Sequence, residues 1–189
     1  MKIQPDHWLD TATRDPIPGG ATMGNRRAVV IHFTGGATAK SSIEAMRERK
    51  LSVHFCIDRD GTIYQCRPCN MTAGHAGASR WKFPDGITRF GLNTCTIGIE
   101  LANAGDNPDV GKKWSGLPLK KARHRNGGPP KEWEQFDPEQ LESCFELCKV
   151  LVARYNLDAV LGHDDIAPER KNDPGPLFPM DKLRTACGF

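Results

Sequence analysis

The sequence has no apolar run that approaches the roughly 20 residues needed to cross a bilayer. We therefore expect no membrane insertion. The first residues, Met1 to Trp8, also lack the apolar core of a secretory signal peptide. This absence predicts a protein that works in the cytoplasm or leaves it by a signal-independent route.

An excess of charge of one sign is missing too. The 26 basic and 23 acidic residues leave a net charge of +3, which does not by itself indicate a nucleic-acid partner. With 38% hydrophobic and 26% charged residues, the chain has the composition of a globular protein. Its 189 residues suffice for one domain with a real core. No internal repeat or domain boundary is present, so we expect a single domain over residues 1–189 and a monomer.

The cysteines lack a second pair with the spacing of metal ligands. Cys66 and Cys69 form the only C-x-x-C motif, whereas a zinc knuckle needs a second ligand pair. Seven cysteines, an odd number, without an export signal predict reduced thiols. A redox role for the motif is the alternative, although the motif ends a strand instead of opening a helix. Cys144 and Cys148 lie four apart on an apolar helical face, where small core residues are expected.

Strand and helix patterns alternate along the chain and predict an α/β fold. Apolar, β-branched runs predict strands over residues 27–34, 52–57, 62–66, 94–101 and 159–161. Helical spacing predicts helices over residues 41–50 and 138–155, and a short helix after Met180. Asp137 as cap, Pro138 in the first turn and Gln140 three residues after the cap form the strongest helix-start signal.

Two segments do not follow these patterns. Residues 1–26 are rich in proline and glycine, and we expect them to wrap around the domain. Residues 103–136 form a long basic insertion loop that carries several lysines and arginines. Such a loop is either functional or mobile, or it is an ordinary solvated surface loop, and the sequence favours neither alternative.

Two histidines stand out by position. His32 lies near the end of an apolar strand before a Gly-Gly break, and His163 follows another apolar strand. Strand ends are where α/β folds place their sites, although His32 would also suit a hydrogen-bonded core histidine. A proline-punctuated loop after His163 folds back and brings Lys171 and Asp173 to the same point. Two imidazoles and a carboxylate predict a zinc ion whose fourth position is open for a water molecule. The zinc ion lowers the pKa of this water molecule to ~7.

Hydrolysis at such a centre needs a carboxylate to move protons and a cation to stabilise the oxyanion. Glu100 lies inside the apolar stretch Ile97–Leu101, where burial without a partner is costly, so a functional site is the favoured interpretation. A glutamate that faces outward is the alternative. Lys171 supplies the cation, and a solvated surface lysine is its alternative.

These residues carry a resemblance to a known family, because five separate segments occur in the same order. Together they resemble the type 2 N-acetylmuramoyl-L-alanine amidases, which include AmpD-like enzymes and are related to peptidoglycan recognition proteins. The aspartate at position 173 resembles the AmpD-like members in particular, because other members of the family carry a cysteine at this position. The matching segments are Ile31–Thr34, Ser52–Gln65, His75–Gly77, Ile97–Glu100 and Gly162–Gly175.

The resemblance implies a central mixed β-sheet flanked by helices, with a site for one zinc ion at one edge of the sheet. It implies that Glu100 is the general base and that Lys171 stabilises the oxyanion. The zinc ligands that it implies are His32, His163 and Asp173.

The resemblance also implies a reaction. The bond cut is the amide between the lactyl group of N-acetylmuramic acid and L-alanine, in peptidoglycan or in muropeptides. His75 is expected near the cleft, either in a structural hydrogen bond or in contact with substrate. The long basic insertion departs from the compact family pattern, so two roles stay open: recycling of anhydro-muropeptides, or attack on intact walls as an endolysin or a delivered antibacterial effector. The rival from another class is a non-catalytic wall-binding module, which loss of a ligand would mark.

Overall fold

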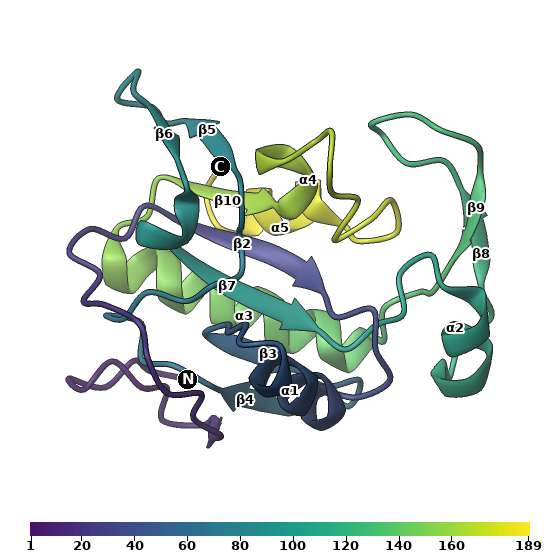
Figure 1. Ribbon diagram of the computed structural model, residues 1–189, viewed down its shortest axis with the longest axis horizontal. Coiled ribbons are helices and arrows are strands. Elements are labelled where there is room, and N and C mark those ends of the chain that lie inside the picture. The colour runs from purple at the N-terminus through teal and green to yellow at the C-terminus, as the bar shows by residue number, and fades with distance from the viewer.

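A computed structural model describes residues 1–189 and places a six-stranded mixed sheet at the centre of the protein (Figure 1). The strands follow the order β1-β4-β3-β7-β2-β10, and only β3 and β4 pair in the antiparallel direction. Because β2, β7 and β10 are parallel neighbours, their carboxyl ends meet at one end of the sheet. The strand bounds are Thr13–Arg14 (β1), Ala28–Phe33 (β2), Phe55–Ile57 (β3), Ile63–Gln65 (β4), Thr96–Leu101 (β7) and Ala159–Gly162 (β10).

One face of the sheet is covered by two helices, α3 (Pro138–Tyr155) and α5 (Met180–Ala186), which lie behind it in Figure 1. The apolar stripe of α3 contributes Leu147 and Leu151 to one buried cluster with Ile97 and Ile99 of β7. These side chains belong to the largest cluster of buried apolar residues in the protein. This core forms a rigid support beneath the strands that carry the site.

The opposite face carries two smaller, separate apolar clusters. In the first, α1 (Ala39–Glu48) packs Ile43 against Val53 and Cys56. In the second, β5 (Arg80–Lys82) and β6 (Thr88–Phe90) form a hairpin whose turn residue Phe83 joins a buried cluster with Val30 of β2. The 3-10 turn Leu92–Thr94 follows the hairpin. A cleft on this face therefore has walls that rest on different clusters.

The predicted fold class is confirmed: the protein has a mixed α/β fold with a central mixed sheet and flanking helices. Each predicted strand and helix is present, with changes only at the ends. The predicted start of α3 is confirmed, because the helix begins at Pro138 with Asp137 at the N-cap position, but the Asp137 side chain makes no capping hydrogen bond. Gln140 is fully buried instead, and its Nε2 donates to the carbonyls of Ile57 (3.1 Å) and Ala102 (3.0 Å). The Gln140 side chain supplies the hydrogen-bond donor for carbonyl groups at the ends of β3 and β7.

Residues 1–26 lie along the hairpin of β3 and β4 and add strand β1 to the edge of the sheet. Gln65 holds the segment in place, because its Oε1 accepts from the Leu9 amide (2.6 Å) and its Nε2 donates to the His7 carbonyl (3.1 Å). Ile3, Leu9 and Met23 of the segment are buried. The N-terminal residues are thus part of the packed fold.

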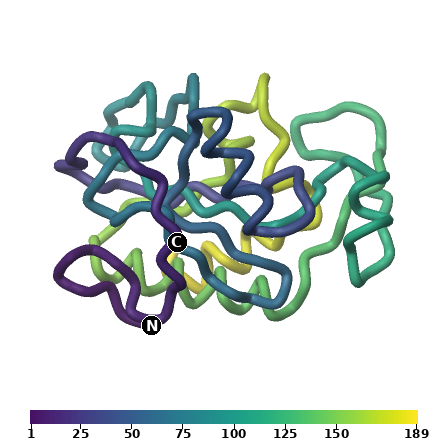
Figure 2. Tube along the Cα trace, turned by 60° about the horizontal axis from the view of Figure 1, so that its bottom comes forward, coloured from purple at the N-terminus to yellow at the C-terminus, as the bar shows by residue number.

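Residues 103–136 contain regular elements that their sequence pattern does not predict. They form α2 (Pro108–Trp114) and the two-stranded sheet of β8 (Lys120–Ala122) and β9 (Lys131–Trp133). Figures 1 and 2 show these elements at one side of the molecule, away from α1 and the N-terminal segment. Elements this short leave too few periodic positions for a pattern to be seen.

The cysteines are all unpaired, and six of the seven are buried. Burial raises the pKa of the Cys66 and Cys69 thiols to about 12. A reactive thiol needs a lowered pKa and access to solvent, so the C-x-x-C motif has a packing role. Cys144 and Cys148 belong to the core beneath α3, as their spacing predicts.

None of the helices combines the length and the apolar composition that crossing a bilayer requires.

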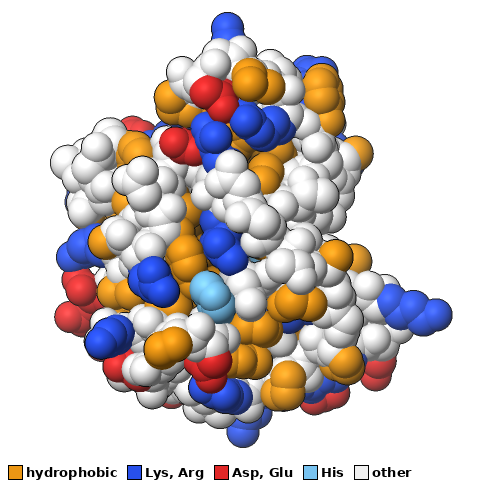
Figure 3. All heavy atoms as spheres, turned by 90° about the vertical axis from the view of Figure 1, so that its left-hand side faces the viewer, with side chains coloured by type: hydrophobic (Ala, Val, Ile, Leu, Met, Phe, Trp, Pro, Cys, Tyr) orange, Lys and Arg blue, Asp and Glu red, His pale blue; other side chains and the backbone are white.

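On the face shown in Figure 3, basic side chains are interspersed with acidic and apolar ones. That face therefore has no continuous band of positive charge.

Gly61 offers a test of how the hairpin of β3 and β4 packs under α3. Its φ is +82°, and an added Cβ would lie 2.7 Å from the Glu139 carbonyl oxygen. Gly86 has a similar φ of +78° with no atom within 4 Å, so it is the matched control. We expect Gly86→Ala to lower the free energy of unfolding by about 1–2 kcal/mol from backbone strain, and Gly61→Ala by about 1–3 kcal/mol more from overpacking. Equal losses in denaturant titrations would contradict this packing.

Candidate metal centre and cleft

Strand register brings the predicted site residues together. In the pairing of β2 with β7, His32 lies opposite Glu100. In the pairing of β2 with β10, Gly162 lies opposite Ile31, so His163 at the start of α4 (His163–Ile166) comes beside His32. Alternation along the strands turns His32 and Glu100 toward the face that carries α1.

The three predicted metal ligands form one compact cluster. His32 Nδ1 lies 2.9 Å from His163 Nδ1, and Asp173 Oδ2 lies 2.9 Å from His32 Nδ1 and 3.0 Å from His163 Nδ1. All three residues are buried, and together they could hold a metal ion. The loop between His163 and Asp173 therefore folds back as its prolines predict.

The hydrogen bonds on the far sides of the two rings indicate which nitrogens carry protons. His163 Nε2 lies 3.1 Å from the Ala76 carbonyl, which can only accept, so this nitrogen is the donor. His75 Nε2 donates in the same way to the Thr96 carbonyl (3.3 Å), which leaves His75 Nδ1 to accept from His32 Nε2 (2.9 Å). In neutral rings, both Nδ1 atoms are then unprotonated.

The cluster is thus three lone-pair atoms about 3 Å apart with no proton among them. Such a group is repulsive unless a cation lies between the three atoms. Burial, the largest influence, lowers the pKa of His32 to about 4, so this ring is neutral at pH 7. The donor set fits a divalent metal of the zinc type.

Glu100 and Lys171 line the same cleft, whose volume is about 750 Å³. One carboxylate oxygen of Glu100, Oε2, is buried without a hydrogen-bond partner. Burial raises the pKa of Glu100 to about 8, the charge of Asp173 adds to this, and the charge of Lys171 opposes it. A carboxyl group that exchanges a proton near neutral pH is suited to general acid–base chemistry.

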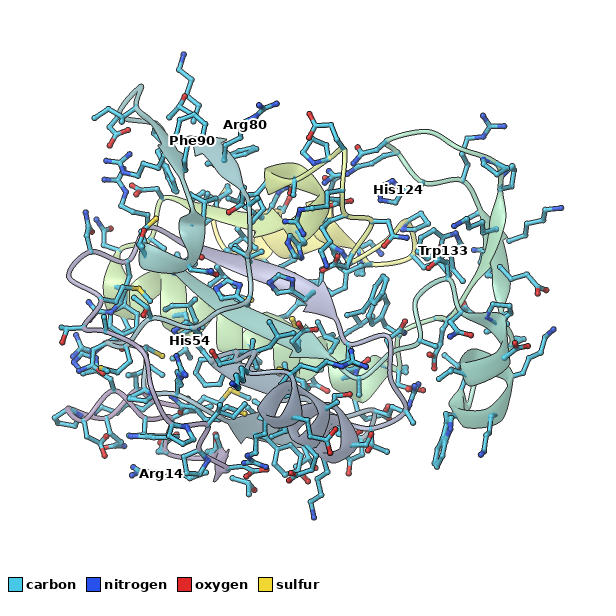
Figure 4. All side chains as sticks on the ribbon, viewed as in Figure 1. Arg14, His54, Arg80, Phe90, His124 and Trp133 are labelled. Atoms are coloured by element: carbon cyan, nitrogen blue, oxygen red, sulfur yellow. The ribbon has the colours of Figure 1, made fainter.

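His75 lies against His32 and has both ring nitrogens occupied by protein partners. Its ring lies over Gly98, where an added Cβ would come 2.6 Å from His75 Cγ. His54, labelled in Figure 4, holds the same strand, because its Nδ1 accepts from the Gly98 amide (3.0 Å). This arrangement favours the structural hydrogen bond over the substrate contact for His75. The glycine inside the predicted strand, Gly98, was the signal in the sequence that another group packs closely against the backbone there.

Several residues of the cleft have no signal in the sequence. One wall is the exposed side of α1, with Ser41 and Met46, and the residue that follows the helix, Arg49. Asn93 fixes the turn opposite, since its Oδ1 accepts from the amides of His75 (3.0 Å) and Ala76 (2.7 Å). The roles of these cleft residues depend on tertiary contacts, which a local sequence pattern does not predict.

The comparisons with known proteins agree with this geometry. Residues 23–176 match the family model of the N-acetylmuramoyl-L-alanine amidases, and the chain belongs to this family. It is 33% identical to AmiD of Escherichia coli over 166 residues, which are 83% of this chain and 51% of AmiD. It is 32% identical to AmpD of Enterobacter cloacae over 135 residues, which are 70% of this chain and 55% of that AmpD. The chain thus spans about half the length of these relatives.

Solved structures show the same fold. A complex of Escherichia coli AmiD with the substrate anhydro-N-acetylmuramic acid-L-Ala-D-γ-Glu-L-Lys superposes with a TM-score of 0.66 at 31% identity, covering 90% of this chain and 60% of that one. A selenomethionine derivative of AmpD gives a TM-score of 0.69 at 27% identity, covering 98% and 99% of the two chains. The family resemblance predicted from the five sequence segments is confirmed.

The raised pKa of Glu100 predicts a pH-dependent contribution to stability in the metal-free protein. Between its ordinary pKa of 4.5 and about 8, the folded state holds this proton while the unfolded state releases it. The folded state binds more protons over this range, so the contribution of Glu100 falls as pH rises. We expect Glu100→Gln to raise the free energy of unfolding more at pH 8 than at pH 5. Since other groups titrate as well, the difference between the two proteins is the quantity to measure, and a pH-independent difference would refute the assignment.

Proposed function

We propose that this protein is a zinc-dependent N-acetylmuramoyl-L-alanine amidase and that residues 1–189 form its single amidase domain. One zinc ion would be held by His32, His163 and Asp173. The observation that carries the proposal is the buried cluster of three unprotonated ligand atoms beside an unpartnered glutamate oxygen. Three protein ligands leave a fourth position for water or substrate, which is the pattern of catalytic and not structural zinc.

Two further side chains complete the chemistry. A zinc ion, when bound, polarises the scissile carbonyl and lowers the pKa of a water molecule. Glu100 takes the proton from the attacking water and delivers it to the departing amine. The Lys171 ammonium stabilises the negative charge that develops on the carbonyl oxygen. The Ala76 carbonyl and His75 keep the two imidazoles in the tautomer that ligation requires.

The substrate in this proposal is the amide between the lactyl group of N-acetylmuramic acid and L-alanine. Family membership and the likeness to AmiD, whose solved complex holds an anhydro-muropeptide, support this choice. The chain would act as a monomer on peptidoglycan or on muropeptides. Recycling in the cytoplasm and attack on intact walls, as an endolysin or a delivered effector, differ in which of these substrates is cut.

Purified sacculi and a soluble anhydro-muropeptide, digested in parallel, separate these roles. We expect mass spectrometry to find stem peptides that begin with L-alanine, lost with a chelator and regained with zinc. Cleavage of the soluble substrate alone would assign the protein to recycling. Binding to sacculi without release from either substrate would support the non-catalytic wall-binding module in place of the enzyme.

Variants at the site separate metal binding from proton transfer. We expect Glu100→Gln to keep zinc and to lower kcat by about 10²–10⁴-fold, because it removes the proton-transfer group alone. His163→Ala should lose both the metal and the activity. Glu142→Gln, at an exposed position of α3, is the charge-matched control. Metal content and turnover are measured on the same samples, and full activity of Glu100→Gln would rule out its role as the base.

A further inference from the structure

The insertion at residues 103–136 reaches back from the side of the molecule and contacts the loop that carries two predicted ligands. Residues 163–175 are called the ligand loop here, and residues 124–126 the bracing turn. His124 is labelled in Figure 4, with Trp133 on the neighbouring strand β9. His124 is buried, although the insertion around it is largely exposed.

The bracing turn surrounds the carboxylate of Asp164, the residue that directly follows His163. His124 Nε2 donates to Asp164 Oδ2 (3.0 Å), and Arg125 donates to both oxygens, from Nε (2.9 Å) and from Nη2 (2.6 Å). The Asn126 side chain donates to the Asp164 carbonyl (3.2 Å). The Asp164 side chain is only 4% exposed, so its charge depends on these donors.

The insertion also holds the other arm of the ligand loop. The Asp164 amide donates to the Asp173 carbonyl (2.9 Å), which joins the residue after His163 to the backbone of the other predicted ligand. Trp133 stacks on His124 with ring centroids 6.0 Å apart. It packs so closely on Gly175 that an added Cβ would lie 2.9 Å from the Trp133 ring. The insertion therefore contacts the ligand loop close to each predicted ligand, at the residue after His163 and at the second residue after Asp173.

We propose that the bracing turn positions His163 and Asp173 for metal binding, and that Arg125 is its principal positioning residue. A metal site gains affinity when its ligands are held in place before the ion arrives, and the groups behind the ligands supply that rigidity. The bidentate contact of Arg125 restrains Asp164 in two directions, which a single donor does not. The metal-binding part rests on the proposed function, whereas the rigidity of the ligand loop does not.

The experiment compares Arg125→Ala and Asn126→Ala with Arg123→Ala in the full chain. Arg123 is exposed in the same insertion, so its substitution removes the same charge from a nearby position. Zinc affinity is measured by competition with a chromophoric chelator, and the visible spectrum of the cobalt-loaded protein reports ligand geometry. Amide hydrogen exchange of residues 163–173 in the metal-free protein reports rigidity without any metal.

We expect Arg125→Ala to weaken zinc binding by about 10–100-fold and to change the cobalt spectrum. Exchange should accelerate in the ligand loop and not in the core strands. Arg123→Ala should match the wild type in all three measurements. Asn126→Ala leaves no buried charge unpaired. It should show smaller changes in zinc affinity, cobalt spectrum and hydrogen exchange, in the same direction. This variant therefore tests the proposal if Arg125→Ala does not fold.

Zinc affinity and exchange like those of Arg123→Ala would overturn the proposal. So would a uniform acceleration of exchange over the whole chain, since that reports a general loss of stability. If the wild type binds no zinc, the proposed metal centre fails, and local exchange in the ligand loop alone decides the role of the bracing turn.

Discussion

The parallel pairing of β2 with its two neighbours is the constraint on which the site depends. Its register places His32 opposite Glu100 and brings His163 to the same end of the sheet. Slipping either pair by one residue would turn a functional side chain to the opposite face. The large apolar cluster under α3 makes such a slip costly, because the same shift would expose isoleucines of β7. The hydrophobic core and the polar site are therefore specified by one register.

The polar groups at the site are buried in a connected arrangement. Each imidazole of the predicted ligand set donates from Nε2 to an acceptor behind it, and the backbone carbonyls of Ala76 and Thr96 determine where the protons lie. Glu100 is the exception, with a buried oxygen that has no partner. A satisfied network makes a rigid site, and the one unsatisfied group is the residue that we propose as the general base.

Sequence patterns predicted α3 and every strand of the central sheet except the short β1, and they marked His32, His163 and Asp173, which the structure brings together, because long apolar periods and strand-end histidines are local signals. They did not predict what lies behind the ligands. Gln140 has a helix-capping pattern, yet it is buried because two strand ends need a donor. Arg125 resembles a solvated cation in the sequence, yet it pairs with Asp164, 39 residues away in the chain. Contacts of this range depend on how the insertion folds back, which no short window of sequence contains.

The two walls of the cleft rest on separate apolar clusters, one under α1 and one under the β5–β6 hairpin. Substitutions on the exposed side of α1 can therefore alter the width and charge of the cleft without disturbing the packing behind His163. In evolutionary terms, residues that shape the cleft can then change independently of the residues that position the buried His32, His163 and Asp173. Divergence within such a fold would be concentrated in α1, while the strands β2 and β10, which place His32 and His163 side by side, stay constant.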